Sequence, residues 1–159
     1  MPQTARLLLL AAFLLALAPT PLFAQSTPAL PGSRTVWTSY GFDALAARLE
    51  KAIEANTMGL VAQASASRGA AARGVKIPGN LVLMVFRNDY AVRMLAASVP
   101  AGIEAPLRIY VTEGADGKAG VTWRAPSAVF APYGSTELNA MARELDPIFE
   151  KIVRDAAGN

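Results

Sequence analysis

The chain has 159 residues, of which 53% are hydrophobic, and its formal net charge is +3 at pH 7. It contains no cysteine and no histidine, which excludes disulfides, thiol chemistry and the side chain most often used as a general base or metal ligand. The basic residues form no cluster along the sequence, so we expect no nucleic-acid partner.

The first 24 residues have the pattern of a secretory signal peptide. Arg6 supplies the positive start, residues 7–18 form an apolar core, and residues 19–21 interrupt the helix before the small residue Ala24. An apolar core of this length is too short to span a bilayer comfortably. We therefore predict a signal peptide over 1–24, a periplasmic or secreted protein, and no stable membrane anchor after cleavage; a retained anchor is the alternative.

The first half of the mature chain alternates strand and helix patterns. Residues 25–33 are predicted to be a flexible leader because proline and glycine stand there among serine and threonine. The elements that follow are predicted from β-branched content, helical spacing of apolar residues and terminating glycines: a strand over 35–39, a helix that starts within 41–43 and runs to about 55, a strand over 60–65 and a short helix over 67–73.

The longest apolar run outside the N-terminal segment covers residues 80–87 and predicts the strand around which the domain is organised. Turn-forming residues flank it, so a strand is favoured over a buried helix. Both sets of alternate side chains are apolar, which is typical of a strand covered on both faces: Leu81, Leu83 and Val85 on one face, and Val82, Met84 and Phe86 on the other.

After this strand the pattern predicts a helix and then a hairpin. Asn88 is predicted to cap a helix over 89–98. Residues 107–113 alternate apolar and polar side chains, which indicates an antiparallel strand with one wet face, and Asp116-Gly117 then turn the chain into a strand over 121–124. The apolar face of the helix is predicted from helical spacing to consist of Val92, Leu95, Ala96 and Val99.

The last helical region is predicted to begin at Ser135 or Thr136, which would cap it. Pro147 interrupts its pattern, so we expect either a kink or two abutting helices at that point. The order of elements is β-α-β-α-β-α-β-β-α. It predicts a single small α+β domain over 34–157, with a mixed, mostly antiparallel sheet and helices packed mainly on one face.

Several short stretches of the mature chain occur together in a recognisable order. They are the first strand and helix, residues 74–78, 83–89, 105–111 and 116–118, with Trp123 and Pro126 closing the pattern. In this order the chain resembles the domain-of-unknown-function family 302 (DUF302) from about Arg34 to Ala157. The resemblance implies a small α+β domain that is often exported in bacteria and has no established activity.

The chain departs from the pattern of this family where relatives carry reactive side chains. Many relatives have an Asp-His pair at the end of the second strand, and by spacing back from Gly74 this pair falls on Ser65-Ala66. Relatives also tend to have Phe-Gly-Asn-Pro where this chain has the sequence of residues 86–89. The resemblance therefore implies a divergent exported member that lacks the Asp-His pair, and it transfers no activity through those positions.

Two groups of residues are candidates for ligand binding. Arg87, Asn88 and Asp89 stand where the long strand passes into a helix, a place where proteins often bind ligands; the alternative is that Asn88 only caps the helix. Trp123, Arg124 and Tyr133, with Phe130, surround a proline-containing loop and offer aromatic rings beside a cation. The alternative for this second group is that Trp123 packs under the last helix and the other aromatic residues hold the loop.

We predict no catalytic residue, no metal ligand and no cofactor, because no reactive group of residues stands out in the sequence. The chain is therefore expected to bind an unknown small molecule or protein without catalysing a reaction. An enzyme built on carboxylates such as Asp89 is the alternative, and it would require two carboxyl groups in one cleft. A homodimer is the third expectation, formed through the exposed side of the strand over 107–113 or through the last helix.

Overall fold

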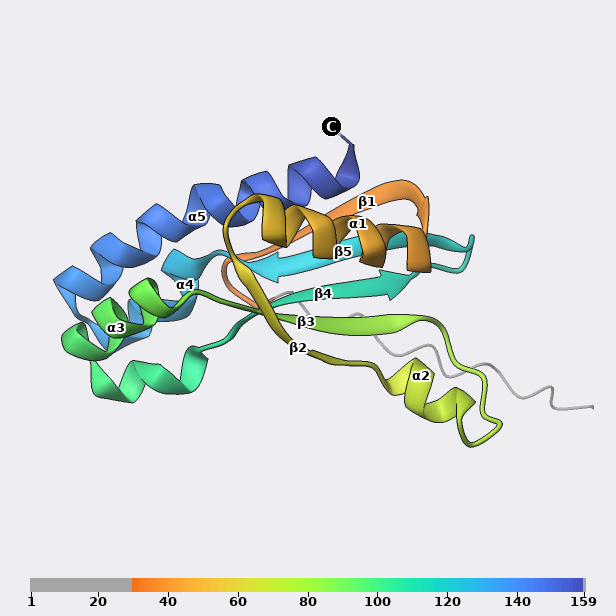
Figure 1. Ribbon diagram of the computed structural model, residues 1–159, viewed down its shortest axis with the longest axis horizontal. Helices are drawn as coiled ribbons and strands as arrows, with labels where there is room; N and C mark the ends of the chain where they lie inside the picture. Colours follow the sequence, from red (N-terminus) through yellow and green to blue (C-terminus); the bar gives the residue numbers. More distant parts are fainter. Residues whose placement is uncertain (1–29, 159) are drawn as a thin grey trace, which may run out of the picture.

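The computed structural model describes residues 30–158 (Figure 1). The predicted signal peptide over 1–24 and the leader residues 25–29 lie outside this range, and the first strand begins at Ser33. The helices and strands of the domain follow the predicted order, with the short helix α4 and two 3-10 helices (η1, η2) added. In chain order they are: β1 (Ser33–Gly41), α1 (Phe42–Ala55), β2 (Gly59–Ala64), α2 (Ala66–Ala71), β3 (Asn80–Phe86), α3 (Asn88–Ala97), η1 (Val99–Glu104), β4 (Leu107–Glu113), β5 (Lys118–Arg124), α4 (Pro126–Phe130), η2 (Ala131–Tyr133) and α5 (Thr136–Ala157).

The five strands form one sheet in the order β1-β5-β4-β3-β2, which confirms the α+β class. All four described strand pairs are antiparallel. The prediction of a mostly antiparallel sheet is therefore confirmed, but the prediction that it is mixed is wrong. The reason is that β1 and β2, which a helix connects, lie at opposite edges of the sheet and never pair. Each strand instead pairs with a neighbour that runs the other way.

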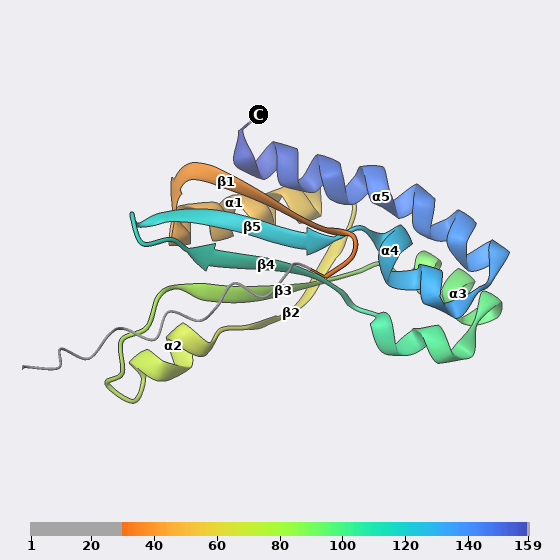
Figure 2. The same ribbon diagram turned by 180° about the vertical axis from the view of Figure 1, so that it is seen from behind.

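The large helices α1 and α5 cover one face of the sheet, as predicted, and no helix layer formed by residues 30–158 covers the other face (Figures 1 and 2). In β3 the side chains of Leu81, Leu83 and Val85 are buried, whereas Val82 and Met84 are half-buried. The prediction that this strand is covered on both faces is therefore wrong. Apolar composition on both faces does not say which face a helix will cover.

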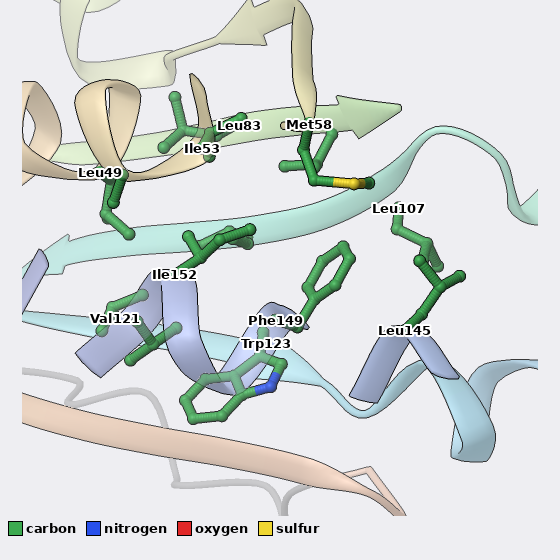
Figure 3. Close-up of a cluster of buried hydrophobic side chains, with 14 of the residues drawn as sticks. Leu49, Ile53, Met58, Leu83, Leu107, Val121, Trp123, Leu145, Phe149 and Ile152 are labelled. Atoms are coloured by element: carbon green, nitrogen blue, oxygen red, sulfur yellow. The ribbon is translucent and has the colours of Figure 1, made fainter. Parts of the chain in front are cut away.

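The hydrophobic core lies between the sheet and the two large helices (Figure 3). Phe149 and Ile152 of α5 are fully buried there, and so are Leu49 and Ile53 of α1. Two amphipathic helices thus bury their apolar sides against one face of the sheet.

Helix α5 begins at the predicted cap and runs as one helix through Pro147. The hydroxyl of Ser135 accepts a hydrogen bond from the backbone N–H of Leu138 at 3.2 Å. Beside the proline, a carboxylate oxygen of Asp146 accepts the backbone N–H of Ser127 at 2.9 Å, which ties α4 to α5. Within residues 30–158, no helix has both the length and the apolar character needed to cross a membrane.

Helix α3 turns a different face to the protein from the one that its sequence predicts. Met94 is its buried residue, whereas Val92 and Leu95 are 60% and 45% exposed, and Val99 after the helix is 74% exposed. The helix docks on α5 at the end of the sheet, where Arg93 forms a two-bonded ion pair with Glu144, each N···O distance being 2.7 Å. This docking, and not the most apolar face, decides which side of α3 is buried.

Candidate functional site

A small pocket with a volume of about 30 Å³ lies where β3 ends and β4 begins, beside α3, α4 and α5. We call it the methionine pocket. Figure 3 shows three of its residues, Met58, Leu107 and Leu145, at one end of the buried cluster. Its lining is apolar apart from Arg87 and the hydroxyl of Tyr90: Met58, Val85, Phe86, Arg87, Tyr90, Ala91, Met94, Ala105, Leu107, Phe130, Met141 and Leu145.

Three of the five methionines of the chain, Met58, Met94 and Met141, line this pocket. Methionine side chains are unbranched and polarizable, so they adapt their shape to the molecule that they contact. They come from three separate parts of the chain, and for this reason the sequence pattern does not reveal them as a group. The pocket volume of about 30 Å³ is smaller than an apolar ligand, so a ligand enters only if these flexible side chains change their rotamers.

Arg87 lies at the rim of the pocket and is held by three neighbours. Its Nε and Nη2 donate to the two carboxylate oxygens of Asp89 at 2.8 and 3.1 Å, and its Nη1 donates to the hydroxyl of Thr57 at 3.2 Å. Its guanidinium carbon lies 4.3 Å from the centre of the Tyr90 ring, which is a cation–π contact. The position of the guanidinium is therefore set before any ligand arrives.

The hydrogen bond from Arg87 lowers the pKa of Asp89 below its ordinary value, and the same bond raises the pKa of Arg87. Because the folded chain holds this carboxyl ionised, the pair contributes stability above the ordinary aspartate pKa of about 4, and the contribution is lost as the pH falls through the lowered value. We expect Arg87→Gln to raise the pKa of Asp89 toward its ordinary value in an NMR titration of the side-chain carboxyl carbon. An unchanged pKa in the variant would contradict this pairing.

Asn88 does not cap α3, contrary to the prediction. Arg87 is the N-cap residue and makes no side-chain capping bond, and Asn88 is the first residue of the helix. The extended backbone ends at Arg87, so the helix begins at Asn88, one residue earlier than a cap at Asn88 would place its start. Of the first predicted group, the structure thus brings Arg87 and Asp89 together at the methionine pocket, with Asn88 between them in sequence.

The structure divides the second predicted group: Trp123 and Arg124 line one hollow together, whereas Tyr133 and Phe130 do not line it. Trp123 is 6% exposed and belongs to the core on the helix-covered face, while Arg124, the next residue of β5, points to the opposite face. The hydroxyl of Tyr133 donates to a carboxylate oxygen of Glu104 at 3.0 Å, and burial raises the pKa of this tyrosine. Phe130 lines the methionine pocket, so it lies with Arg87 of the first predicted group and not with the second group.

Ser65, which stands at the position assigned to the missing Asp-His pair, has a structural role here. It follows β2 directly and caps α2 by accepting the N–H of Arg68 at 3.1 Å. Its hydroxyl also donates to the backbone carbonyl of Asn80 at 2.6 Å. These bonds hold the β2–α2 junction against the start of β3. The absence of the family's Asp-His pair at Ser65-Ala66 remains a prediction.

The alternative of a carboxylate enzyme finds no support in this geometry. The side chain of Asp89 is 59% exposed and is paired with Arg87. The residues that line the methionine pocket include no carboxylate. The second carboxyl group that such a mechanism requires is therefore not part of this pocket.

The fold and pocket define a small α+β domain whose antiparallel sheet is covered by helices on one face. Residues 34–156 match the family described as domain of unknown function DUF302, and the chain belongs to this family. A similar solved structure is the crystal structure of uncharacterized conserved protein DUF302 from Bacillus stearothermophilus. Its TM-score is 0.71 and its sequence identity 18%, over 80% of this chain and 99% of that chain, which supports the fold alone. No curated protein matches the chain.

Proposed function

We propose that this domain is an exported binding protein that takes up a small, mainly apolar molecule in the methionine pocket. The observation that carries the proposal is the pocket itself, which combines an apolar lining with one cation at its rim. Ligand pockets in proteins have volumes of roughly 300–1,000 Å³ and a mostly apolar lining with a few placed polar groups. The volume of this pocket, about 30 Å³, is well below that range, so the proposal requires the methionine side chains to move aside when a ligand binds.

Arg87 provides the polar contact in this proposal. Two of its five N–H donors are directed to Asp89 and one to Thr57, which leaves donors for a carbonyl, hydroxyl or carboxylate of the ligand. Because Asp89 already balances the charge of Arg87, the site does not require an anion. A short aliphatic chain that ends in one hydrogen-bond acceptor has the chemistry that matches both parts of the site.

The experiment compares 1-octanol with octanoate, which share an apolar chain and differ in the charge of the end group. Binding to the mature chain, residues 25–159, is followed by NMR through the methionine methyl signals. We expect both probes to shift the signals of Met58, Met94 and Met141, which line the pocket. Arg87→Ala is expected to weaken the binding of octanoate more than the binding of 1-octanol, because only octanoate presents a charge to the guanidinium.

A matched pair of variants on α3 locates the binding. Ala91 lines the pocket, whereas Ala96 of the same helix is exposed on its outer side. We expect Ala91→Phe to raise the dissociation constants of both probes by roughly tenfold or more, because the ring fills the pocket. We expect Ala96→Phe to leave the binding of both probes unchanged. Equal effects of the two variants, or no methionine shift in the wild type, would overturn the proposal.

A further inference from the structure

A hollow of about 230 Å³ lies at the end of the sheet where β4 begins and β5 ends. We call it the arginine hollow. Figure 2 shows this end of the two strands close to α4, which contributes Val129 to the lining. The lining includes Arg108 and Arg124, and none of the described residues that line it is a carboxylate. The charged side chains of the described lining are therefore all positive.

The two arginines lie opposite each other on neighbouring strands. Tyr110 of β4 pairs with Thr122 of β5, and Arg108 and Arg124 continue this antiparallel register on the same face of the sheet. Side chains that lie directly opposite each other are about 5 Å apart at Cβ, and like charges at this distance destabilise the sheet. An anion between the two guanidinium groups would relieve this repulsion.

The charge of Arg124 is less well balanced than the charge of Arg108. Glu104 places a carboxylate oxygen 3.7 Å from Nη2 of Arg108, although the same carboxylate also accepts the hydroxyl of Tyr133 at 3.0 Å. No carboxylate among residues 30–158 forms an ion pair with Arg124. The part of the chain that the structure describes therefore leaves the charge of Arg124 without a counter-charge.

One nitrogen of Arg124 is buried without a hydrogen-bond acceptor. Its Nε is shielded from solvent, and no atom of residues 30–158 accepts a hydrogen bond from it. Its Nη2 donates to the backbone carbonyl of Ala128 at 3.4 Å, which is long for such a bond. Buried polar groups in proteins nearly always have a partner. The Nε–H of Arg124 therefore favours a ligand that offers an acceptor oxygen.

The size and the surroundings of the arginine hollow suit an anion from outside the chain. Its volume of about 230 Å³ far exceeds the 30 Å³ of the methionine pocket. A water molecule occupies about 30 Å³ in the liquid, so the hollow has room for an anion with several non-hydrogen atoms. Residues 25–29, which precede Leu30 at the edge of the hollow, contain no acidic residue and supply no charge to balance the arginines.

We propose that the arginine hollow binds a small organic anion, a carboxylate or a phosphate on an apolar body, through the guanidinium groups of Arg108 and Arg124. Guanidinium groups form two parallel hydrogen bonds with either kind of anion. Leu107 and Val129, which also line the hollow, offer apolar contact to the body of the ligand. Because Asp89 balances Arg87 at the methionine pocket, the two sites differ in charge, and this proposal does not depend on the function proposed above.

The test follows the Nε–H signals of the arginine side chains by NMR in the mature chain, residues 25–159. The probes are benzoate and phenyl phosphate, and benzyl alcohol is the neutral control. We expect the anions to shift the Nε–H signal of Arg124 and benzyl alcohol to leave it unchanged, because only the anions present charged acceptor oxygens. A shift with one of the two anions alone would support the site and identify the class of anion that it takes.

Three variants locate the binding. We expect Arg124→Gln to raise the dissociation constant of the bound anion roughly tenfold or more, because a charge-assisted pair of hydrogen bonds is lost. Arg108→Gln is expected to act in the same direction, and since this side chain is 61% exposed its replacement removes no core contact. Arg143→Gln is the matched control, because Arg143 is exposed on α5 and does not line the hollow. Circular dichroism should show that each variant keeps its fold.

The methionine signals separate this site from the methionine pocket. Leu107 lines both sites, whereas Met58, Met94 and Met141 line only the methionine pocket. Anions that shift the methionine signals and leave the Nε–H signal of Arg124 unchanged would refute the proposal. An Arg124 signal that neither anion shifts would refute it as well, and so would an effect of Arg143→Gln as large as the effects of Arg108→Gln and Arg124→Gln.

Discussion

Replacing Phe149 with alanine is expected to lower the free energy of unfolding by about 3–5 kcal/mol. Phe149 is fully buried where α5 packs over the sheet, within the cluster that Figure 3 shows. Removing the ring loses its burial free energy and leaves a cavity that two helices and a sheet cannot close completely. Because small domains are stable by about 5–15 kcal/mol, the loss is a large part of the total.

Urea unfolding followed by far-UV circular dichroism measures this difference. Val92→Ala is the matched control, since Val92 is apolar and helical but 60% exposed. We expect the control to change stability by less than about 0.5 kcal/mol. Similar losses in the two variants would show that Phe149 does not occupy the centre of the core.

Replacing Gly79 with alanine is expected to destabilise the domain by about 1–3 kcal/mol. An added Cβ at Gly79 would lie 2.6 Å from Cγ of Phe42, the ring atom closest to the backbone of α1. That atom cannot move away by a rotation of the ring tip, so the whole side chain must leave its place against the core. The strain therefore reaches both the first turn of α1 and the start of β3.

Gly69→Ala is the matched control for this substitution. Gly69 lies in α2, and an added Cβ there meets nothing within 4 Å. Alanine favours a helix over glycine, so we expect this control to stabilise the protein by about 0.5–1 kcal/mol. In thermal unfolding, we expect Gly79→Ala to lower the midpoint temperature relative to the wild type and Gly69→Ala to raise it. A stabilising effect of Gly79→Ala would contradict the contact with Phe42.

Local sequence patterns predicted the elements of this domain well. The alternation in β4, the glycine-containing turn before β5 and the cap of α5 at Ser135 all appear in the structure. Each depends on residues that are close in sequence, because strand alternation, turn geometry and helix capping act over a few residues. The order of strands in the sheet was not predicted, since it depends on which distant strands pair.

The candidate site was predicted in part, and the reason is also one of distance along the chain. Arg87 and Asp89 were found because they are two residues apart at the end of an apolar strand. Phe130 was assigned to a different group, and the three methionines were not identified as site residues, because the residues of the pocket come together from several separate elements. No spacing in the sequence marks such a group.

The sequence by itself determined the class of the domain and the order of its main elements, because these depend on composition and local periodicity. Only the tertiary structure decided which face of α3 is buried and that helices cover only one of the two apolar sides of β3. It also decided that Trp123 faces the core while Arg124 lies on the opposite face of the sheet. These choices depend on where α1, α3 and α5 dock. Docking is a competition between surfaces that are far apart in sequence, and a local pattern contains no information about its outcome.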